Sequence, residues 1–514
     1  MNTAENIVGA ASLDDLVRGL VDLPEDLPPV FMRTSVTGVK MDSRQLQPGD
    51  LFLACFGRNH DARHFINYAI KAGAGAVVAE SGGDWQGLTV VDNVPVLAVD
   101  NLSAKLSEIA GRFYRMPSHA MTVFGITGTN GKTSCSQFIA AALAELGYRC
   151  GILGTLGYGP YGELEDVELT TPDPVFTQMA LAQMHHEHLE PIAMEVSSVG
   201  LHQHRVRALK FDTVIFTNLT RDHLDYHETM ESYAENKRKL FMMDGLRSAV
   251  VNLDDAYALP MINSLANQVA VYTYSVESPA ATIHTSALSL EENGYTATVN
   301  TPIGSGNLTG KLLGRFNISN LLAVIAVLIS YLDRRGGAAD IDTILAAVAR
   351  LEPVNGRMEI VGSGDITAVV DYAHTPDGLK CALSALRGHF TGRIWCIFGC
   401  GGNRDQGKRP MMGEIAEQFA DELIIADDNP RNEEGDNIVQ HILSGISDRS
   451  RVTILRDRGA AIDFAITRAT SGDVVLVAGK GHENYQDIRG SRILFSDRNQ
   501  VRLALQKRGG GLAN

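Results

Sequence analysis

The segment that most constrains the fold is residues 123–146, where an apolar stretch, a glycine-containing loop and a second patterned stretch follow one another. Residues 123–126 have the composition of a buried strand, and residues 134–146 have the spacing of a helix that Gly147 ends. Between them, residues 127–134 read T-G-T-N-G-K-T-S. In such a loop the backbone N–H groups point at phosphate oxygens, the lysine adds charge and the following hydroxyl binds Mg²⁺. The segment therefore predicts a strand–loop–helix unit that binds ATP with Mg²⁺.

This loop departs by one place from the strict G-x-x-x-x-G-K-[ST] pattern, because Ile126 stands where the first glycine should be. A glycine-rich turn with an incidental lysine is the alternative interpretation, and the flanking strand and helix argue against it. We predict ATP contacts from seven consecutive residues: Gly128, Thr129, Asn130, Gly131, Lys132, Thr133 and Ser134.

Short apolar runs alternate with longer helical patterns through the rest of the chain, which predicts parallel sheets covered by helices. Further strands are predicted at residues 192–196, 213–217, 368–372, 394–398, 423–426 and 474–477. Two proline-containing breaks, at residues 115–121 and 351–358, divide the chain into domains 1–118, 119–350 and 351–514. A typical domain has about 150 residues, which agrees with three. The predicted fold class is α/β, with a smaller N-terminal α/β domain, a central P-loop ATPase domain with a parallel sheet, and a C-terminal Rossmann-like domain.

Composition narrows the partners and the compartment. The 60 acidic residues outnumber the 45 basic ones, and the net charge of −15 argues against a nucleic acid or an anionic membrane as partner. The six cysteines form no C-x-x-C pair, which favours reduced thiols over a zinc site or disulfides. No signal peptide is recognisable, and the charge-free stretch between Arg315 and Asp333 falls short of the roughly 20 apolar residues of a membrane span. We expect a cytoplasmic monomer.

Six further motifs follow the loop in order. They are M-E-V-S-S at 194–198, N-L-T-R-D-H-L-D at 218–225, Y-x-x-x-K-x-x-L-F at 233–241, G-x-x-N-x-x-N at 314–320, G-R-x-E at 356–359 and D-Y-A-H at 371–374. With the T-G-T-N-G-K-T loop, this set resembles the Mur ligase family, whose members join amino acids to a UDP-sugar in bacterial cell-wall synthesis. Residues 42–44 (D-S-R) with 48–52 (P-G-D-L-F) resemble the uridine-binding N-terminal domain of some members, and D-N-P-R at 428–431 resembles the signature for adding meso-diaminopimelate.

The resemblance implies an ATP-dependent amide ligase that joins meso-diaminopimelate to the D-Glu of UDP-MurNAc-L-Ala-D-Glu through an acyl phosphate, in cytoplasmic peptidoglycan precursor synthesis. Three alternatives are weighed against it: the L-lysine-adding ligase of the same family, a folylpolyglutamate synthetase, and a P-loop nucleotide-dependent switch or binding protein. The synthetase is not expected to carry the D-S-R…P-G-D segment, and a switch has no need of an amino-acid pocket.

Glu195 ends a predicted apolar strand, where a carboxylate is costly unless it holds a cation. The resemblance implies that Mg²⁺ is bound by Thr133, Glu195 and His223, although His223 taken alone could be a loop histidine that caps a helix. Lys237 has basic neighbours and reads by itself as a solvated lysine on a charged helix face. The resemblance instead implies N6-carboxylysine at Lys237, a carbamate derived from CO₂ near Mg²⁺. The implied catalytic residues are Lys132, Glu195, His223 and Lys237.

Family position also implies the substrate contacts. For UDP-MurNAc-dipeptide they are Met41, Ser43, Arg58, Asn59, His60, Thr170, Thr171, Ser197, Gln203 and Arg205. Further ATP contacts are Asn317, Asn320, Arg357 and Asp371. The threonines and the serine could equally be ordinary caps, and the two asparagines could be packing devices on one helix face.

Diaminopimelate has a distal ammonium and a distal carboxylate. A guanidinium fork matches a carboxylate in a bidentate way that lysine cannot, so we predict that Arg404 and Arg431 bind the distal carboxylate. Asn429 and Glu483 are expected to hold the distal ammonium, with surface arginines in glycine-rich loops as the alternative. The full predicted set is Arg404, Asp428, Asn429, Pro430, Arg431, Gly479 and Glu483.

Overall fold

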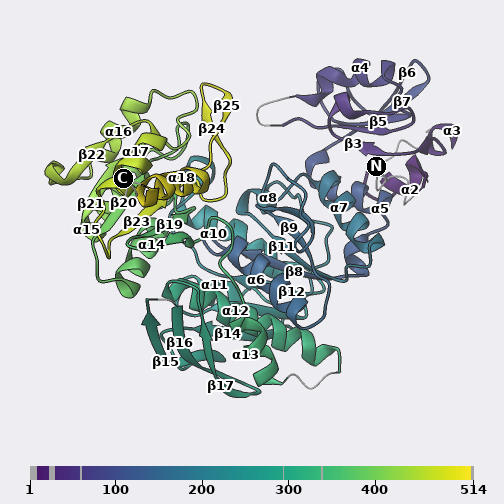
Figure 1. Ribbon diagram of the computed structural model, residues 1–514. Helices are drawn as coiled ribbons and strands as arrows, with labels where there is room; N and C mark the ends of the chain where they lie inside the picture. The colour runs from purple at the N-terminus through teal and green to yellow at the C-terminus, as the bar shows by residue number, and fades with distance from the viewer. Residues whose placement is uncertain (1–8, 22–28, 58–60, 293, 337–339, 511–514) are drawn as a thin grey trace. The chain divides into compact units, whose positions relative to one another are not determined.

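A computed structural model describes residues 9–21, 29–57, 61–292, 294–336 and 340–510 of the chain (Figure 1). The chain forms two compact units. The first comprises Met1–Thr127, Tyr148–Val214 and Asn236–Arg247, and the second comprises Gly128–Gly147, Ile215–Glu235 and Ser248–Asn514. Each unit is an α/β structure built around its own strands.

A five-stranded sheet of order β3-β4-β5-β7-β6 opens the first unit. Its strands are β3 (Val39–Lys40), β4 (Leu51–Ala54), β5 (Ala76–Glu80), β6 (Leu88–Val91) and β7 (Val94–Val99). All are parallel except β6, which pairs antiparallel with β7. Alternate side chains point to opposite faces, where α2 (Leu13–Val17) and α5 (Leu106–Phe113) cover one face and α4 (Ile66–Lys71) the other. This is the predicted small N-terminal α/β domain.

The remaining strands of the first unit have the order β10-β9-β11-β8. Their bounds are β8 (Thr122–Thr127), β9 (Gly151–Gly154), β10 (Gly157–Pro160) and β11 (Pro191–Glu195). The predicted strands at 123–126 and 192–196 are thus confirmed to within a residue or two. β11 lies parallel between β8 and β9, and its last residue, Glu195, pairs with Ile126. The carboxylate therefore stands beside the strand end that leads into the P-loop.

The second unit begins with the P-loop and α6 (Lys132–Glu145), while β12 (Thr213–Phe216) runs from the first unit into the second. Its next strands have the order β13-β14-β15-β16-β17: β13 (Ser248–Asn252), β14 (Ala270–Ser275), β15 (Ile283–Glu291), β16 (Gly294–Thr301) and β17 (Gly304–Gly310). The pairs β13/β14 and β14/β15 are parallel, and the last two pairs are antiparallel.

Helix α12 (Arg315–Arg334) is long and apolar enough to cross a membrane by length and composition alone, but 78% of its apolar window is buried. It packs on β13, β14 and α6 and contacts α13 (Ile341–Ala349). α12 is therefore a core helix, and its burial against these elements explains its apolar composition.

A six-stranded sheet of order β18-β19-β23-β20-β21-β22 ends the chain, and only β18 is antiparallel to its neighbour. Its strands are β18 (Glu359–Ser363), β19 (Thr367–Asp371), β20 (Ile394–Phe398), β21 (Glu422–Ile425), β22 (Val452–Ile454) and β23 (Val474–Ala478). Apolar clusters on its two faces involve α14 (Pro376–His389), α15 (Lys408–Phe419) and α16 (Gly435–Leu443) on one, and α17 (Arg458–Arg468) and α18 (Asp497–Gly510) on the other. This is the predicted Rossmann-like arrangement, and the strands predicted in it are confirmed.

The remaining helices and strands lie between or beside these sheets in the sequence. They are β1 (Ala11–Ser12), α3 (Pro29–Met32), β2 (Ser35–Val36), α7 (Pro174–His186), α8 (Ser198–His202), α9 (Leu224–His227), α10 (Met230–Arg238), α11 (Ala258–Ile262), β24 (Tyr485–Ile488) and β25 (Ser491–Leu494).

One ion pair between α17 and α18 is fully buried. The Arg458 guanidinium donates to both carboxylate oxygens of Asp497 at 2.7 and 2.8 Å, and both side chains are 0% exposed. Arg458 Nη2 also donates to the carbonyl of Ala478 at 2.8 Å, at the end of β23. The pair therefore joins two helices to the strand that leads into the loop at residues 479–483.

We expect Asp497→Ala to lower the free energy of unfolding by about 3–5 kcal/mol, because it leaves a buried guanidinium without its counter-ion. The matched control is Asp463→Ala, which removes the exposed ion pair of Lys507 (2.8 Å) between the same two helices and is expected to cost less than about 1 kcal/mol. Urea unfolding followed by circular dichroism measures both. Equal effects would contradict the importance of burial.

Candidate active site

The P-loop adopts a backbone shape that only glycine permits at two places. Gly128 and Gly131 have φ angles of +153° and +89°. A Cβ at Gly128 would lie 1.8 Å from Thr217 Oγ1, and one at Gly131 would lie 2.7 Å from Asn320 Oδ1. The glycines predicted to bend this loop are therefore required by close contacts as well as by conformation.

The P-loop is tied to the segment that follows β12. The Thr129 and Asn130 N–H groups donate to the carbonyl oxygen and to Oδ1 of Asn218, each at 2.9 Å. In return, Asn218 Nδ2 and Thr217 Oγ1 donate to the Asn130 carbonyl at 3.1 and 2.6 Å. The first residue of the N-L-T-R-D-H motif, Asn218, thus holds the P-loop in place, a role that its motif does not predict.

Lys132 lies at the start of α6 with its ammonium folded over the loop. Nζ donates to the carbonyl oxygens of Gly128 and Thr129 at 2.8 and 2.9 Å. The hydroxyl of Thr129 is 3.1 Å from the hydroxyl of Tyr233, and Tyr233 is the first residue of the Y-x-x-x-K motif. A phosphate at this loop would meet a positive charge already held in place by the backbone.

Asn317 and Asn320 lie on α12, one turn apart and buried, as predicted. Asn317 Nδ2 donates to the Leu313 carbonyl at 2.9 Å, and Asn320 Nδ2 lies 3.4 Å from Asn317 Oδ1. Asn320 Oδ1 also borders Gly131. The two asparagines are therefore hydrogen-bonded within the helix, and Asn320 also borders the P-loop. Their contact with ATP stays a prediction.

Arg357 and Asp371 come from the C-terminal sheet region. Arg357 stacks 4.2 Å from the centre of the Tyr372 ring, and its Nη2 is 3.4 Å from the Thr133 hydroxyl. Asp371 accepts from the N–H groups of Met358 and Ala373 at 2.7 and 2.8 Å. Burial raises the pKa of Asp371, while Arg357 and these two N–H groups act in the opposite direction. Arg357 thus brings a cation to the P-loop.

Glu195 is buried, with 1% of its surface exposed. Its Oε1 accepts from the Thr155 N–H at 2.8 Å and its Oε2 from the Thr155 hydroxyl at 2.9 Å. A Cβ at Gly154 would lie 2.3 Å from Oε1, so only glycine leaves room for the carboxylate. Carboxylate and hydroxyl oxygens are ligands that Mg²⁺ prefers, so the chemistry of this position fits the metal.

The predicted dipeptide contacts of the first unit come together beyond β9 and β11. The Thr170 hydroxyl is 2.9 Å from that of Thr155, and the Thr171 hydroxyl accepts from the Ser197 N–H at 2.9 Å. Arg205 donates to the Thr171 carbonyl at 2.5 Å and to Gln203 Oε1 at 2.6 and 3.0 Å. Ser197 Oγ also caps α8. Thr155 was not predicted, because a lone threonine after a short strand carries no signal.

The remaining predicted dipeptide contacts belong to the N-terminal domain. Ser43 is buried at the start of a short 3₁₀ helix (Ser43–Gln45) that Asp42 caps, and Met41 packs at the edge of the apolar core. Arg58, Asn59 and His60 lie outside the described residues. Their place in the binding of the UDP-sugar stays a prediction.

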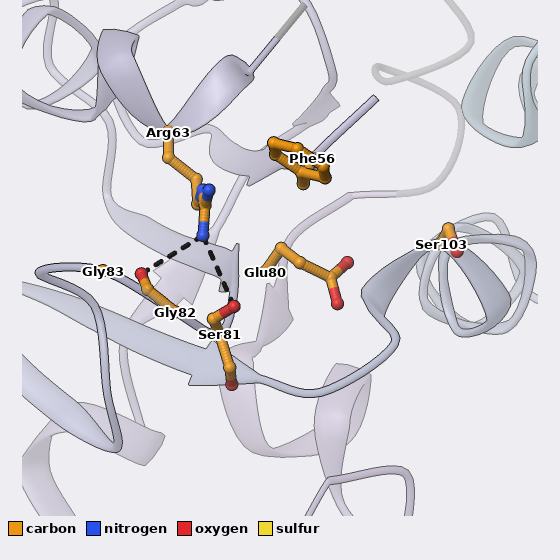
Figure 2. A pocket seen from close by; sticks show the side chains of 7 residues that line it. All are labelled: Phe56, Arg63, Glu80, Ser81, Gly82, Gly83 and Ser103. Atoms are coloured by element: carbon orange, nitrogen blue, oxygen red, sulfur yellow. Dashed lines mark hydrogen bonds between the residues drawn. The ribbon is translucent and has the colours of Figure 1, made fainter. Parts of the chain in front are cut away.

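A cavity of about 530 Å³ lies in the N-terminal domain, lined by Phe56, Arg63, Glu80, Ser81, Gly82, Gly83 and Ser103 (Figure 2). Its walls follow the carboxyl ends of β4, β5 and β7, where ligands collect in open parallel sheets. Phe56 is 60% exposed, and the Arg63 guanidinium lies 5.0 Å from its ring centre. Arg63 also donates to the Gly82 carbonyl at 3.1 Å. The Arg63 guanidinium is paired with Asp61 at 2.8 Å, and the exposed Phe56 ring offers a face on which a flat ligand can stack.

His223 occupies the N-cap position of α9 with a positive φ of +54°, as the helix-cap alternative has it, but its side chain makes no capping bond. Lys237 is only 1% exposed within α10, so the solvated-surface alternative is wrong. Burial of an ammonium is costly, which argues for a function at this position. In the described part of the chain, no group of three or more His, Cys, Asp or Glu residues could hold a metal by itself. Glu195 and Lys237 belong to the first unit, and Thr133 and His223 to the second.

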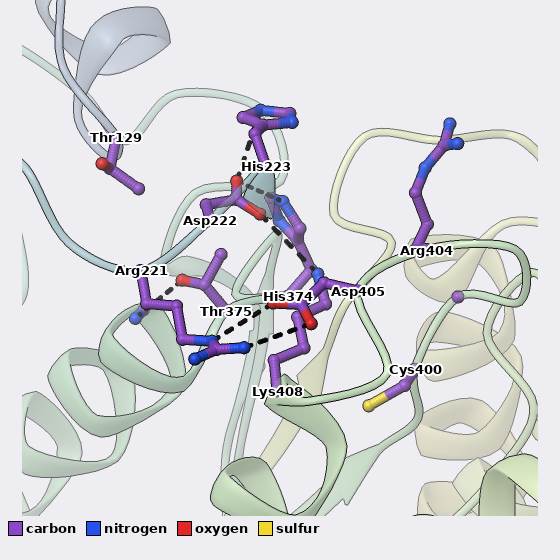
Figure 3. A network of polar contacts seen from close by, with 12 residues as sticks. Thr129, Arg221, Asp222, His223, His374, Thr375, Cys400, Arg404, Asp405 and Lys408 are labelled. Atoms are coloured by element: carbon purple, nitrogen blue, oxygen red, sulfur yellow. Dashed lines mark hydrogen bonds and ion pairs between the residues drawn. The ribbon is translucent and has the colours of Figure 1, made fainter. Parts of the chain in front are cut away.

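Three basic groups surround the buried Asp222 carboxylate (Figure 3). His223 Nε2, His374 Nε2 and Lys408 Nζ lie 3.4, 3.8 and 3.9 Å from its oxygens. Burial by itself would raise the pKa of Asp222, but the His374 hydrogen bond and the nearby charges hold it well below its usual value. The adjacent Arg221 pairs with Asp405 at 3.2 Å. Ion pairs thus connect the loop of Arg221, Asp222 and His223 (the D-H loop) to the loops that follow strands of the C-terminal sheet.

The predicted amino-acid residues lie in neighbouring loops at the carboxyl edge of that sheet. Asn429 Nδ2 donates to Glu483 Oε2 at 2.8 Å, and Arg431 Nη1 donates to the Gly402 carbonyl at 2.9 Å. A Cβ at Gly479 would lie 2.3 Å from Asp428 Oδ2, so Asp428 borders Gly479. The structure brings this cluster together. Arg404, by contrast, is exposed and extends away from the neighbouring network in Figure 3.

The second compact unit carries both the P-loop and a Rossmann-like sheet with a polar cluster at its carboxyl edge, an arrangement that suits an ATP-dependent amide ligase. Three family descriptions match the chain: "Mur ligase family, catalytic domain" at residues 35–114, "Mur ligase middle domain" at 126–328 and "Mur ligase, glutamate ligase domain" at 356–481. The chain belongs to the Mur ligase family.

Relatives agree in sequence and in structure. The UDP-N-acetylmuramoyl-L-alanyl-D-glutamate–2,6-diaminopimelate ligase of Pseudomonas aeruginosa is 48% identical over 466 residues, which cover 90% of this chain and 94% of that protein. The protein of the same name from Coxiella burnetii is 44% identical, with coverage of 91% and 96%. A solved structure of a ligase with this name superposes with a TM-score of 0.68 at 33% identity, and covers 97% and 99% of the two chains.

We predict that Gly131→Ala weakens ATP binding about tenfold or more, because its methyl group displaces Asn320 and shifts the N–H groups that face phosphate. The matched control is Gly147→Ala at the other end of α6, where φ is also positive (+85°) but nothing lies within 4 Å. Both substitutions carry a similar backbone strain of about 1–2 kcal/mol. Calorimetric titration with ATP separates them, and equal affinities for the two variants would contradict the role of the Gly131–Asn320 contact.

Proposed function

We propose that this protein is an ATP-dependent ligase that joins meso-diaminopimelate to the D-Glu carboxylate of UDP-MurNAc-L-Ala-D-Glu in peptidoglycan precursor synthesis. The observation that carries the proposal is the cluster of Arg431, Asn429 and Glu483, in the same compact unit as the P-loop. A guanidinium close to a carboxylate complements a zwitterion, which is what the distal end of diaminopimelate presents. The names of the relatives support the same substrate.

A carboxylate is a poor electrophile, so the reaction needs an acyl phosphate made from ATP. Lys132 and the N–H groups of the first turn of α6 bind the phosphates and stabilise charge at the transferred phosphoryl group, while the Thr129 and Asn130 N–H groups hold the loop to Asn218. Thr133, Glu195 and His223 would hold Mg²⁺, which neutralises phosphate charge when bound. Carbamylation by CO₂ would give Lys237 a carboxylate character that suits a position near the metal. The incoming amine then attacks the acyl carbon, and phosphate leaves.

The binding of the UDP-sugar falls to the N-terminal domain and to residues beyond β9 and β11. Thr170, Thr171, Ser197, Gln203 and Arg205 form the dipeptide end, where Arg205 is held by the Thr171 carbonyl. Phe56 and Arg63 line a cavity of the N-terminal domain. We further propose the domain boundaries 1–118, 119–350 and 351–514, a cytoplasmic monomer, and no nucleic-acid or membrane partner.

The L-lysine-adding ligase is the closest alternative. Arg431 already donates to the Gly402 carbonyl and lies 3.9 Å from the Asp487 carboxylate. L-Lysine has no distal carboxylate, so the remaining N–H groups of the guanidinium would lose water without gaining a partner. Sites built to pair a polar group reject an analogue that lacks it much more strongly than apolar pockets reject a missing methylene. The D-N-P-R motif therefore favours diaminopimelate.

The first test compares the two amino acids in ADP and phosphate release with UDP-MurNAc-L-Ala-D-Glu and ATP. We expect turnover that depends on meso-diaminopimelate and a strong preference for it over L-lysine. ATP hydrolysis that depends on neither amino acid would refute the ligase proposal. A preference for L-lysine would refute the argument from Arg431.

In the same assay, Arg431→Ala is expected to raise the KM for diaminopimelate by about 10- to 100-fold, which corresponds to the loss of charge-assisted hydrogen bonds worth about 1.5–3 kcal/mol. The KM for ATP should change less than about twofold. Arg489→Ala is the matched control, because this exposed arginine lies in the same loop region and pairs with Glu434. Equal increases in both KM values would remove the recognition role.

Lys237→Ala is expected to lower kcat by about 100-fold or more, because it removes a group proposed to carry charge next to the metal. Added formate or acetate should restore part of the activity by entering the vacated space as a carboxylate. Lys239→Ala, two residues away and bonded to Asn236 at 2.7 Å, is the control and should stay active. Full activity of Lys237→Ala would overturn the catalytic role, and mass spectrometry of the native chain tests the added CO₂ directly.

A further inference from the structure

Lys480 is a fully buried lysine between two residues proposed to bind the amino acid. Its side chain is 0% exposed, and its Nζ donates to Asn429 Oδ1 at 3.0 Å and to Glu483 Oε2 at 2.8 Å. The ring centre of Tyr485 lies 5.5 Å from Nζ. A buried ammonium is tolerated only when it is paired and hydrogen-bonded, and here both partners belong to the proposed pocket.

These contacts determine which way the Asn429 amide faces. Oδ1 accepts from Lys480 and also from the backbone N–H of Asp487 at 2.9 Å. A backbone N–H and an ammonium can only donate, so the atom facing them must be the carbonyl oxygen. Both of its lone pairs are then used. On the other side, one Nδ2 hydrogen is given to Glu483 Oε2.

Glu483 is fixed by the same group. Its Oε2 accepts from Lys480 and from Asn429, each at 2.8 Å. In the part of the chain that the structure describes, its Oε1 accepts no hydrogen bond, and the side chain is 16% exposed. One oxygen of the carboxylate thus belongs to the protein and the other is available to a ligand.

We infer that Lys480 is a positioning residue that holds Asn429 and Glu483 so that the pocket presents one amide N–H and one carboxylate oxygen. This inference rests on the proposed function and deepens it. Glu483 Oε1 receives the distal ammonium, whereas the second Nδ2–H of Asn429 points to the distal carboxylate together with Arg431. Asn429 is then a carboxylate ligand, which differs from the ammonium ligand that the sequence alone suggests.

Asn429→Asp tests this orientation most sharply. The variant keeps an acceptor for Lys480 and for the Asp487 N–H, but it replaces the donor side of the amide by a second acceptor. We expect the KM for diaminopimelate to rise about tenfold or more, because the new oxygen faces Glu483 and the ligand carboxylate. If Asn429 instead bound the ammonium, the added charge would lower this KM or leave it unchanged, and either result would overturn the inference.

Lys480→Met tests the positioning itself, since methionine has a similar length and no donor. We expect the KM for diaminopimelate to rise about tenfold, while the KM for ATP and for UDP-MurNAc-L-Ala-D-Glu changes less than about twofold. Lys507→Met, an exposed lysine that pairs with Asp463, is the matched control. Equal increases in all three KM values would mean a general structural role and would contradict the inference.

A double-mutant cycle shows whether Lys480 acts through Glu483. The variants are Lys480→Met, Glu483→Gln and the two combined. If the lysine works by holding the glutamate, the combined variant is no worse than Glu483→Gln alone, because the coupled effects do not add. Additive losses would contradict the proposed route. Should Lys480→Met not fold, Asn429→Asp and Glu483→Gln still decide the assignment of the two ligand ends.

The wild-type protein is measured in every series. Absence of diaminopimelate-dependent turnover in the wild type would refute the proposed function. Normal wild-type turnover with unchanged KM values in Asn429→Asp and Lys480→Met would refute only the inference about Lys480.

Discussion

The hydrogen bonds between the P-loop and Asn218 are the interaction on which the rest of the site depends. The Asn130 N–H donates to the Asn218 side chain, and the Asn218 amide donates back to the Asn130 carbonyl. Gly128 lies so close to Thr217 that no side chain fits between them. A loop with two positive φ angles has little stability of its own, so its shape has to be imposed by a neighbour. The neighbour continues into Asp222 and His223, and a single backbone arrangement therefore positions the phosphate site and the D-H loop together.

The protein is acidic as a whole, but several buried charged side chains are paired with opposite charges nearby. The net charge of −15 describes the solvent-facing surface, whereas several of the buried charges occur in matched groups. Asp222 is surrounded by Lys408 and two histidines, and Lys480 is bonded to Glu483. A buried charge without a partner costs several kcal/mol, so each of these residues constrains the geometry of the others. Anionic substrates are consequently met by a few fixed cations and N–H groups.

Much of the fold could be predicted from the sequence, because buried parallel strands are continuous apolar runs and the P-loop needs glycines at fixed places. Within the second unit, the motif residues Asn218, Tyr233 and Asn320 lie against the P-loop. Burial of single polar residues could not be predicted, since it depends on contacts between distant segments. Lys237 sits in a basic sequence and is nevertheless buried, and Lys480 lies between two glycines with no sign of its partners. The orientation of the Asn429 amide likewise depends on Asp487, which is 58 residues away.

The pairing of Lys480 with Glu483 bears on how the pocket treats charge at the distal end of a ligand. The lysine compensates the glutamate, so an additional ammonium gains less from Glu483 than it would from an isolated carboxylate. A zwitterionic end also carries a carboxylate. That carboxylate can accept hydrogen bonds from Arg431 and from the Asn429 N–H, while the ammonium donates to Glu483 Oε1. Both ligand groups are then paired, and Arg431, Asn429 and Glu483 each keep a partner. A ligand that ends in an ammonium alone satisfies half of this arrangement, and the unpaired half is the physical basis for its rejection.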